Sequence, residues 1–425
     1  MKRLLALILA LTMVMSMAAC GDNAEPTGES TTAPSAPANN PTDPSGSTGS
    51  TTPSGTTAPT EPAEKPEVLL RDSYSVSDDR AIAGRETVIA TIGDEVLTNG
   101  VLQVFYWQDV FSFLTQYGSY AIYYGLDHTK PLDEQKCSMI DGTWQQYFLQ
   151  DAIKMWHTYA AMAYRADQEG IPTSQEDQDR IDGMPEALEK ARQELKFDTV
   201  DEMVQADMGP GVTAEDYITY QTLYYRSYSY YNHLMDTTTF NDLQVEGWFT
   251  SNTDKLAQSG ITKETVGYDV RHILIEVAKE KTDADWTKCQ TDAQAILDQW
   301  LAGEKTEDSF ADLAKEKSAD GGSASNGGLY TDLTKDTNFV QPFKDWYLDS
   351  SRQAGDTGLV KSDYGYHVMY FSGSGLIWMD YCRQAMTQES VTEQMEAIVS
   401  NCKVTIAYDD IGLGVLDMTP EETEQ

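Results

Sequence analysis

The sequence predicts an α+β protein that is mostly helical and includes one small sheet covered by helices. Two apolar runs with strand character, residues 269–275 and 365–371, stand far apart in the chain, and each carries one histidine, His272 and His367. Elsewhere, apolar residues recur every three or four positions, which is the spacing of amphipathic helices. The two histidine-bearing runs are therefore expected to be strands of one sheet in a largely helical chain.

Residues 1–20 have the pattern of a secretory signal. Two basic residues come first, and the apolar run from Leu4 to Met17 is too short to cross a bilayer as a helix. Residues 17–20, which end at Cys20, resemble the lipobox of bacterial lipoproteins, and this resemblance implies that Cys20 is lipidated. An ordinary signal peptide with a chance cysteine is the alternative.

Residues 21–66 consist mainly of Ser, Thr, Pro, Ala and Gly and contain no aromatic residue. Such a segment cannot bury enough apolar surface to offset the entropy cost of ordering it, so a disordered linker is expected. With a lipid at its start, the linker would tether the folded part of the protein to a membrane.

The charge balance limits the classes of partner. The chain carries 30 Lys and Arg against 68 Asp and Glu, a formal net charge of -38. This excludes generic binding to the phosphate backbone of nucleic acids, which depends on clustered cations, and it predicts a weak attraction for cationic clients. The chain has no His-Glu-x-x-His motif, no Gly-x-Ser-x-Gly elbow and no Gly-x-x-x-x-Gly-Lys loop, so no metal or cofactor is expected.

The cysteines after Cys20 are Cys137, Cys289, Cys382 and Cys402, and their spacings match no zinc or redox motif. Two interpretations stay open outside the cytoplasm. One is a bridge between Cys382 and Cys402, and the other is a set of scattered, buried thiols.

The first folded elements are expected at residues 88–97, where two β-rich runs flank a Gly-Asp turn and predict a hairpin. Thr98 or Asn99 can cap the helix that follows. A second helix is expected at residues 142–169, where apolar residues return at helical spacing.

Further helices are expected on both sides of the sheet region. Thr173 and Glu176 form a capping box that predicts a helix start, and Ser390 and Glu393 form a second one after a helix at residues 378–386. Between them, a helix from residue 213 to 234 has a tyrosine-rich face: Tyr217, Tyr220, Tyr224, Tyr228 and Tyr231. This stripe favours packing inside the helical region, and a surface that grips unfolded polypeptide is the alternative.

Between the two histidine-bearing strands, the pattern predicts two helices, a glycine-rich loop at 319–328, a weak strand at 328–331, a helix at 341–348 and a strand at 358–361. This order resembles a parvulin-type (PpiC or rotamase) peptidyl-prolyl isomerase domain. The residues Ile92 to Thr98 are similar to the opening of SurA-like and PrsA-type extracytoplasmic foldases.

These resemblances imply a domain organisation. A parvulin-like domain at 242–375 would be inserted into a helical foldase domain formed by 67–241 and 376–415, and residues 416–425 would form an acidic tail. The resemblance also implies a chain anchored by its lipid on the extracytoplasmic face of a cell membrane, and it favours the side that faces a cell wall.

The resemblance also assigns candidate site residues. His272 and His367 fall on the paired histidines of the family, and Asp320 falls where the family has a cysteine or aspartate near the substrate carbonyl. Ser362 falls on a hydroxyl residue that hydrogen-bonds the pair, and it is expected to link the two rings and fix their tautomers. The predicted walls for the prolyl ring and substrate are Phe339, Val340 and Phe343.

Two departures from the family pattern concern this site. The family's Gly-Asp-Leu-Gly-aromatic sequence is here residues 327–331, Gly-Gly-Leu-Tyr-Thr, and a glutamine of the pocket is replaced by Val340. Cys289 lies on the apolar face of a helix and is interpreted as a packing residue. The departures bear on the rate of the reaction more than on the fold.

The expected function is that of a membrane-anchored peptidyl-prolyl cis-trans isomerase that assists the folding of exported proteins. Its partners would be unfolded or newly secreted polypeptides with X-Pro bonds, and a homodimer is left open. The alternative is a non-catalytic chaperone that binds unfolded polypeptide and carries a degenerate parvulin domain. A structural envelope protein is a third, weaker hypothesis.

Overall fold

The computed structural model describes residues 71–416 and residue 418. The predicted signal, the lipidation site Cys20 and the linker at 21–66 lie outside these residues. The chain forms two compact units. The first consists of the described residues up to His157, Asp179–Leu223 and the residues from Val404 onward, and the second consists of Thr158–Gln178 and Tyr224–Lys403.

The first unit is built around a hairpin and several helices. Its elements are β1 (Ser75–Val76), α2 (Asp78–Gly84), β2 (Val88–Ile92), β3 (Glu95–Thr98), α3 (Asn99–Tyr117), η1 (Gly118–Tyr124), α6 (Val200–Met208), η3 (Tyr408–Asp410) and β8 (Leu413–Gly414), with parts of α4 (Trp144–Glu169), α5 (Gln175–Leu195) and α7 (Ala214–Thr237). The predicted hairpin is confirmed by the antiparallel pairing of β2 with β3. Thr98 caps α3 and accepts a hydrogen bond from the backbone N–H of Val101.

The C-terminal segment returns to the first unit. β8 pairs in parallel with β1, so that Ser75 faces Leu413. Two buried amides of α3 complete the contact: Asn99 donates to the carbonyl of Asp410, and Gln103 accepts from the N–H of Gly414 at 2.7 Å. These bonds satisfy polar groups that would otherwise be buried without partners.

The capping box predicted before α5 is shifted by one residue. Ser174, not Thr173, accepts the hydrogen bond from a backbone N–H, and the donor belongs to Asp177. The Ser174 hydroxyl also donates to the Asp177 carboxylate at 2.8 Å. Ser and Asp cap a helix as well as Thr and Glu do, so the sequence alone could not choose between the overlapping pairs.

The tyrosine-rich face of α7 divides into two parts. Tyr217 and Tyr220 are buried, as the packing interpretation predicts. Tyr224, Tyr228 and Tyr231 are half-buried, and the ring of Tyr228 stacks on both of its neighbours at centroid distances of 6.0 and 6.3 Å. The C-terminal half of this face is therefore partly open to solvent.

The second unit contains a four-stranded sheet. Its elements are α8 (Asp242–Ser251), α9 (Thr253–Gln258), β4 (Val266–Glu276), α10 (Asp283–Ala302), α11 (Glu307–Lys317), η2 (Ala324–Asn326), β5 (Leu329–Leu333), α12 (Gln341–Tyr347), β6 (Thr357–Ser362), β7 (Gly365–Leu376) and α13 (Trp378–Asn401). The strand order is β5-β4-β7-β6, and every pair is antiparallel. The two strands that were expected to carry the histidines are the central ones, β4 and β7.

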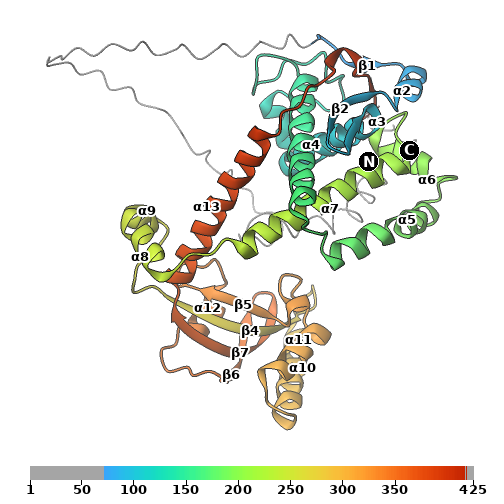
Figure 1. Ribbon diagram of the computed structural model, residues 1–425. Helices are drawn as coiled ribbons and strands as arrows, with labels where there is room; N and C mark the ends of the chain where they lie inside the picture. The colour runs from blue at the N-terminus through green and yellow to red at the C-terminus, as the bar shows by residue number, and fades with distance from the viewer. Residues whose placement is uncertain (1–70, 417, 419–425) are drawn as a thin grey trace, which may run out of the picture. The chain divides into compact units, whose positions relative to one another are not determined.

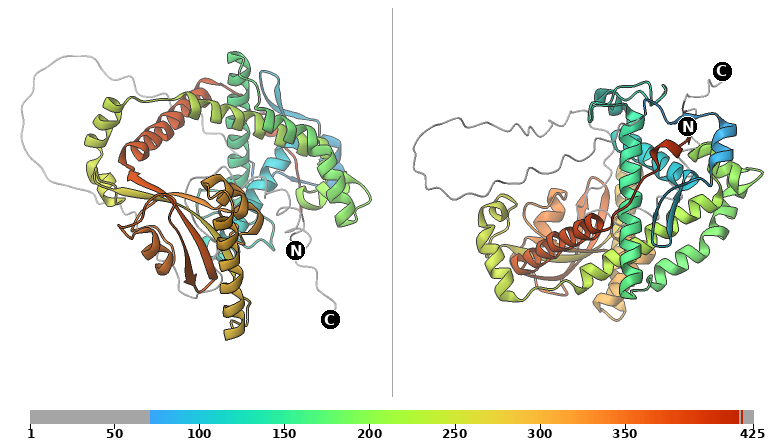
Figure 2. Two further views of the ribbon diagram at one scale, coloured as in Figure 1. Left: turned by 90° about the horizontal axis from the view of Figure 1, so that it is seen from below. Right: turned by 45° about the horizontal axis from the view of Figure 1, so that its top comes forward.

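Helices cover both faces of this sheet. In Figure 2, α10 and α11 lie on one side and α12 on the other. Side chains alternate along β7 as the period of a strand requires: Val368 and Tyr370 pack under α10 and α11, and Met369 and Phe371 pack under α12. The predicted α+β class, with a small sheet covered by helices, is confirmed.

α13 leaves β7 as one continuous helix, visible in Figure 1 as the long helix after the sheet. The sequence predicted a break before Ser390, and that prediction is wrong, because the capping pattern of Ser390 and Glu393 occurs within a helix that has no other reason to end there. Cys382 is a buried, free thiol on this helix, which favours scattered thiols over a bridge to Cys402. None of the helices within residues 71–416 is long and apolar enough to span a membrane.

Candidate active site

The register of the two central strands brings the two histidines together. His272 lies opposite Met369, and His367 lies opposite Leu274. Residues 367 and 369 are on the same face of β7, so both imidazoles project toward the α12 side of the sheet. They are buried, and their rings stack with centroids 5.3 Å apart.

A single chain of hydrogen bonds runs through both rings. The Nδ1 atoms of His272 and His367 are 3.1 Å apart, and Nε2 of His272 is 3.0 Å from Oδ2 of Asp320. Ser362 Oγ is 2.7 Å from Nε2 of His367. The expectation that Ser362 links the two histidines needs correction: the rings bond to each other directly, and Ser362 holds the outer end of the chain.

The ionisation of Asp320 sets the direction of every bond in this chain. Burial by itself raises the pKa of Asp320, but the hydrogen bonds from His272, Ser323 and Tyr330 hold the pKa below its usual range. An ionised carboxylate only accepts, so His272 donates from Nε2, and a neutral His272 ring then accepts at Nδ1 from the N–H of His367. Nε2 of His367 then accepts from the Ser362 hydroxyl. Each neutral ring thus has one fixed tautomer.

His367 is kept neutral by its surroundings. Burial, with His272 beside it, lowers the pKa of His367 to about 3, and the charge of Asp320 offsets this only in part. A neutral ring at this position suits the hydrogen-bond chain, because a second proton on His367 would remove the acceptor that Ser362 needs.

Two further residues, which sequence reasoning missed, hold the Asp320 carboxylate. The hydroxyl of Tyr330 donates to Oδ2 at 3.0 Å, and the fully buried hydroxyl of Ser323 donates to the same oxygen. Asp320 itself is buried and receives three donors on one oxygen. The signal that could have found Tyr330 is its position: it lies in the stretch where the sequence departs from the family pattern.

Backbone contacts fix the loop that carries Asp320. The N–H of His272 donates to the carbonyl of Gly328 at 2.8 Å, and the N–H of Ala319 donates to the carbonyl of Leu274 at 2.9 Å. The Arg271 guanidinium donates to two carbonyls near the end of the loop and forms an ion pair with Glu307 at 2.9 Å. The loop is therefore attached to β4 at both ends.

The predicted aromatic wall lies directly against the histidines. Phe343, from α12, is 1% exposed and meets both imidazoles edge-on at centroid distances of 5.2 and 5.4 Å. Phe339 stacks on Phe343 at 4.9 Å and is half-buried, as is Val340. The solvent-facing part of the wall thus comes from Phe339, Val340 and the ring of Tyr330, which meets Phe339 edge-on.

This combination of a four-stranded antiparallel sheet, paired histidines and an adjoining aromatic wall is that of a parvulin-type domain. Residues 272–373 match the model of the rotamase family, described as a PPIC-type PPIase domain. The chain therefore contains a domain of this family, and the recognition made from the sequence is confirmed. Among the residues that the structure describes, no cluster of His, Cys, Asp and Glu could hold a metal ion.

Individual proteins show similarity beyond this domain. Cbf2 of Campylobacter jejuni, named as a candidate peptidyl-prolyl cis-trans isomerase, is 26% identical over 176 residues, which cover 40% of this chain and 58% of Cbf2. The match thus spans less than two thirds of the relative's length.

Two solved structures are also similar to this chain. PrsA from Bacillus subtilis is 16% identical, with 63% of this chain and 88% of PrsA covered and a TM-score of 0.33. A SurA-like chaperone of Campylobacter jejuni is 19% identical, with 74% and 94% covered and a TM-score of 0.21.

Proposed function

We propose that this protein is an extracytoplasmic peptidyl-prolyl cis-trans isomerase that assists the folding of exported polypeptides. The observation that supports this function best is the hydrogen-bond chain from Ser362 through both histidines to Asp320, placed directly behind Phe339 and Phe343. A merely structural pair of histidines would not need a buried carboxylate with three donors.

The reaction makes and breaks no covalent bond. The site therefore needs to bind the peptide and stabilise the twisted amide. Rotation about an X-Pro bond crosses a barrier of about 18–20 kcal/mol because the twisted state loses amide resonance. A site lowers this barrier when it binds the twisted amide more tightly than either planar form. Phe339 and Val340 offer a partly exposed apolar surface for the prolyl ring, and Phe343 supports that surface from behind.

The polar chain behind this wall would act through its fixed charge. Resonance puts negative charge on the substrate carbonyl oxygen, so a nearby negative charge disfavours the planar amide. Asp320 supplies that charge from a buried position, where charges are screened less than at the surface. His272 and His367, each in one fixed tautomer, connect this carboxylate to Ser362 through hydrogen bonds. Each bond in the chain polarises the next one.

The substrate class and location follow from the rest of the chain. The lipobox-like residues ending at Cys20 and the linker at 21–66 support a protein that is tethered outside the cytoplasm by a lipid. The rotamase match over residues 272–373 and the helices before and after it support an isomerase domain at 242–375 carried within a helical foldase. Substrates would be unfolded polypeptides with X-Pro bonds.

The experiment is a proline-limited refolding assay with the full chain. We expect wild type to accelerate refolding, and we expect Phe339→Ala and Asp320→Asn to lose most of the acceleration. Phe339 is half-buried, so its replacement removes the proposed contact with less risk to folding than replacement of Phe343 or His272. Tyr123→Phe, at a tyrosine that is 82% exposed, is the matched control. Wild type that leaves the refolding rate unchanged would remove the isomerase proposal.

A non-catalytic chaperone is the second candidate, and the burial of Phe343 favours it. A ring that is 1% exposed contacts a prolyl ring only after Phe339 moves. If the full chain suppresses aggregation of a refolding client without accelerating its proline-limited phase, this second function takes the place of the first.

A further inference from the structure

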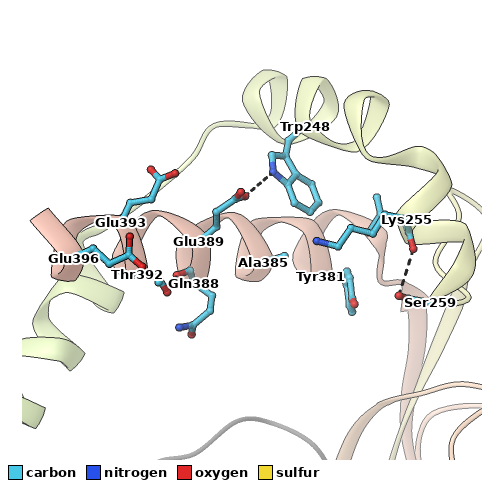
Figure 3. A pocket seen from close by; sticks show the side chains of 11 residues that line it. Trp248, Lys255, Ser259, Tyr381, Ala385, Gln388, Glu389, Thr392, Glu393 and Glu396 are labelled. Atoms are coloured by element: carbon cyan, nitrogen blue, oxygen red, sulfur yellow. Dashed lines mark hydrogen bonds between the residues drawn. The ribbon is translucent and has the colours of Figure 1, made fainter. Parts of the chain in front are cut away.

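A pocket of about 470 Å³ lies in the second unit, away from the histidines, where α8 and α9 face α13. Figure 3 shows its side chains, with Trp248 on one wall and a row of α13 residues on the other. The volume lies within the range of about 300–1,000 Å³ that ligand pockets occupy. None of the functions discussed so far uses this pocket.

One face of α13 builds the long wall of the pocket. The residues recur at helical spacing: Tyr381, Ala385, Gln388, Glu389, Thr392, Glu393 and Glu396. On an adjoining face of the same helix, Cys382 and Met386 pack into the apolar core shared with α8 and α9. The wall is thus held in place by a core, and its exposed carboxylates line the pocket.

The floor and rim of the pocket differ in chemistry. Trp248 is half-buried, its Nε1–H donates to Glu389 at 3.1 Å, and its ring faces the cavity in Figure 3. The rim carries three exposed carboxylates, and the one lysine that lines the pocket is Lys255. Within the part of the chain that the structure describes, none of these carboxylates forms an ion pair.

We propose that this pocket binds a lysine- or arginine-containing segment of an unfolded client polypeptide. A cation over the indole of Trp248 gains a cation–π contact, and Glu389, Glu393 and Glu396 can pair with it. Two nearby cations outside the pocket do not compete for these carboxylates: Arg383 pairs with Asp242 and Asp380, and Lys263 pairs with Glu246. The net charge of -38 attracts the same class of client over a longer distance.

The position of the pocket in the chain gives such binding a use, which rests on the proposed isomerase function. α9 leads into β4, and α13 follows β7, so the pocket is built from the segments that enter and leave the isomerase domain. A client held there keeps its prolines at a high effective concentration near the site.

The test uses the full chain and two proline-free, fluorescein-labelled peptides, one rich in lysine and the other with glutamate in place of every lysine. We expect the lysine peptide to bind more tightly by fluorescence anisotropy, with an affinity that falls as salt is added. The variant Glu393→Lys/Glu396→Lys should weaken its binding about fivefold or more. Because the peptides lack proline, this readout is independent of isomerase activity.

Two further variants make the result specific. Glu280→Lys/Glu304→Lys changes the net charge equally at exposed residues outside the pocket and should leave the affinity near that of wild type. Lys255→Gln removes the cation of the pocket and should tighten binding, an outcome that a misfolded variant would not give. Equal binding of the two peptides, or equal losses in both double variants, would overturn the proposal. Self-association of the wild-type protein would also overturn the proposal if Glu393→Lys/Glu396→Lys abolishes it. A second copy of the chain would then occupy the pocket.

Discussion

At the scale of single residues, one carboxylate in the site determines where the protons lie on the neighbouring imidazoles. Asp320 stays ionised because His272, Ser323 and Tyr330 all donate to it. Its charge in turn decides which nitrogen of each imidazole carries a proton. The hydroxyls of Ser323 and Tyr330, which donate to Asp320 and to neither imidazole, therefore influence the histidines through that carboxylate.

Tyr330→Phe tests this influence. The variant keeps the ring that meets Phe339 and loses one hydrogen bond to Asp320, which is worth about 1 kcal/mol or roughly a fivefold change in rate. We expect kcat/KM for an X-Pro peptide to fall by about that factor. The acid limb of the pH–rate profile should also move to higher pH, because Asp320 loses a donor that stabilises its charged form.

A purely structural role for Tyr330 would lower stability and leave the acid limb in place. Tyr123→Phe, at an exposed tyrosine far from any residue of the site in sequence, controls for the loss of a hydroxyl.

His367 predicts how stability depends on pH. Its pKa is about 3 in the folded protein and 6.5 as the ordinary value, so the unfolded chain binds more protons between these limits. Stability contributed by this residue is therefore present above pH 6.5 and is lost as the pH falls toward 3, with a slope of up to about 1.4 kcal/mol per pH unit.

The measurement is urea unfolding of wild type and His367→Asn across this pH window. The variant is expected to be less stable at neutral pH, and the difference should shrink as the pH falls. A constant difference would show that His367 does not titrate with a lowered pKa.

The residues of the site could be predicted from the sequence, but the hydrogen bonds between them could not. His272, His367, Asp320, Ser362 and the two phenylalanines were all identified through the resemblance to the family. That the histidines bond directly to each other depends on the register of β4 and β7, which their separate sequences do not specify. Tyr330 was missed because its hydroxyl reaches Asp320 only after the glycine-rich loop folds back on β4.

At the scale of elements, the glycines at the end of that loop keep β5 close to β4. Gly328 has a φ of +74°, and a Cβ there would lie 2.2 Å from the carbonyl oxygen of His272. No side chain fits without moving one strand away from the other. The position of Asp320 therefore depends on a backbone contact as well as on its own hydrogen bonds.

Gly328→Ala should separate these strands near His272. We expect a loss of about 2 kcal/mol or more in the free energy of unfolding, and a change in the NMR shifts of both imidazoles. Gly373→Ala, in β7, is the matched control, since no atom lies within 4 Å of its added Cβ. Equal effects of the two substitutions would contradict this account.

Element boundaries were predicted less well than the elements themselves. The central strands and the hairpin were found because alternating apolar residues mark them strongly. The shifted cap at Ser174 and the uninterrupted helix α13 were missed because capping residues also occur where no helix begins. Past Ser390, the buried Val391 packs against Met162 and Ala166 of α4 and Tyr230 and Leu234 of α7, a contact that the local sequence does not reveal.

At the scale of the whole molecule, the excess of acidic residues is the dominant feature. With 68 Asp and Glu against 30 Lys and Arg, repulsion between like charges opposes the compact state. Within residues 71–416, most of these groups are exposed, so dissolved ions screen them over a Debye length of about 10 Å at 0.1 M salt.

Added sodium chloride should therefore stabilise the protein. We expect Tm to rise between low salt and about 0.15 M, and to rise less for Glu280→Lys/Glu304→Lys, which carries less negative charge. Differential scanning calorimetry measures both. A Tm that falls or stays constant would mean that attractive ion pairs outweigh the repulsion.

The pairing of β1 with β8 has a consequence for how the protein matures. A ribosome makes Ser75 long before Leu413, so β1 has no partner while most of the chain is being synthesised. During that time, the amides of Asn99 and Gln103 lack the carbonyl and N–H groups that they bond in the finished molecule. The first unit can close only after the second has been translated, so the edge of β1 stays unpaired until the end of synthesis.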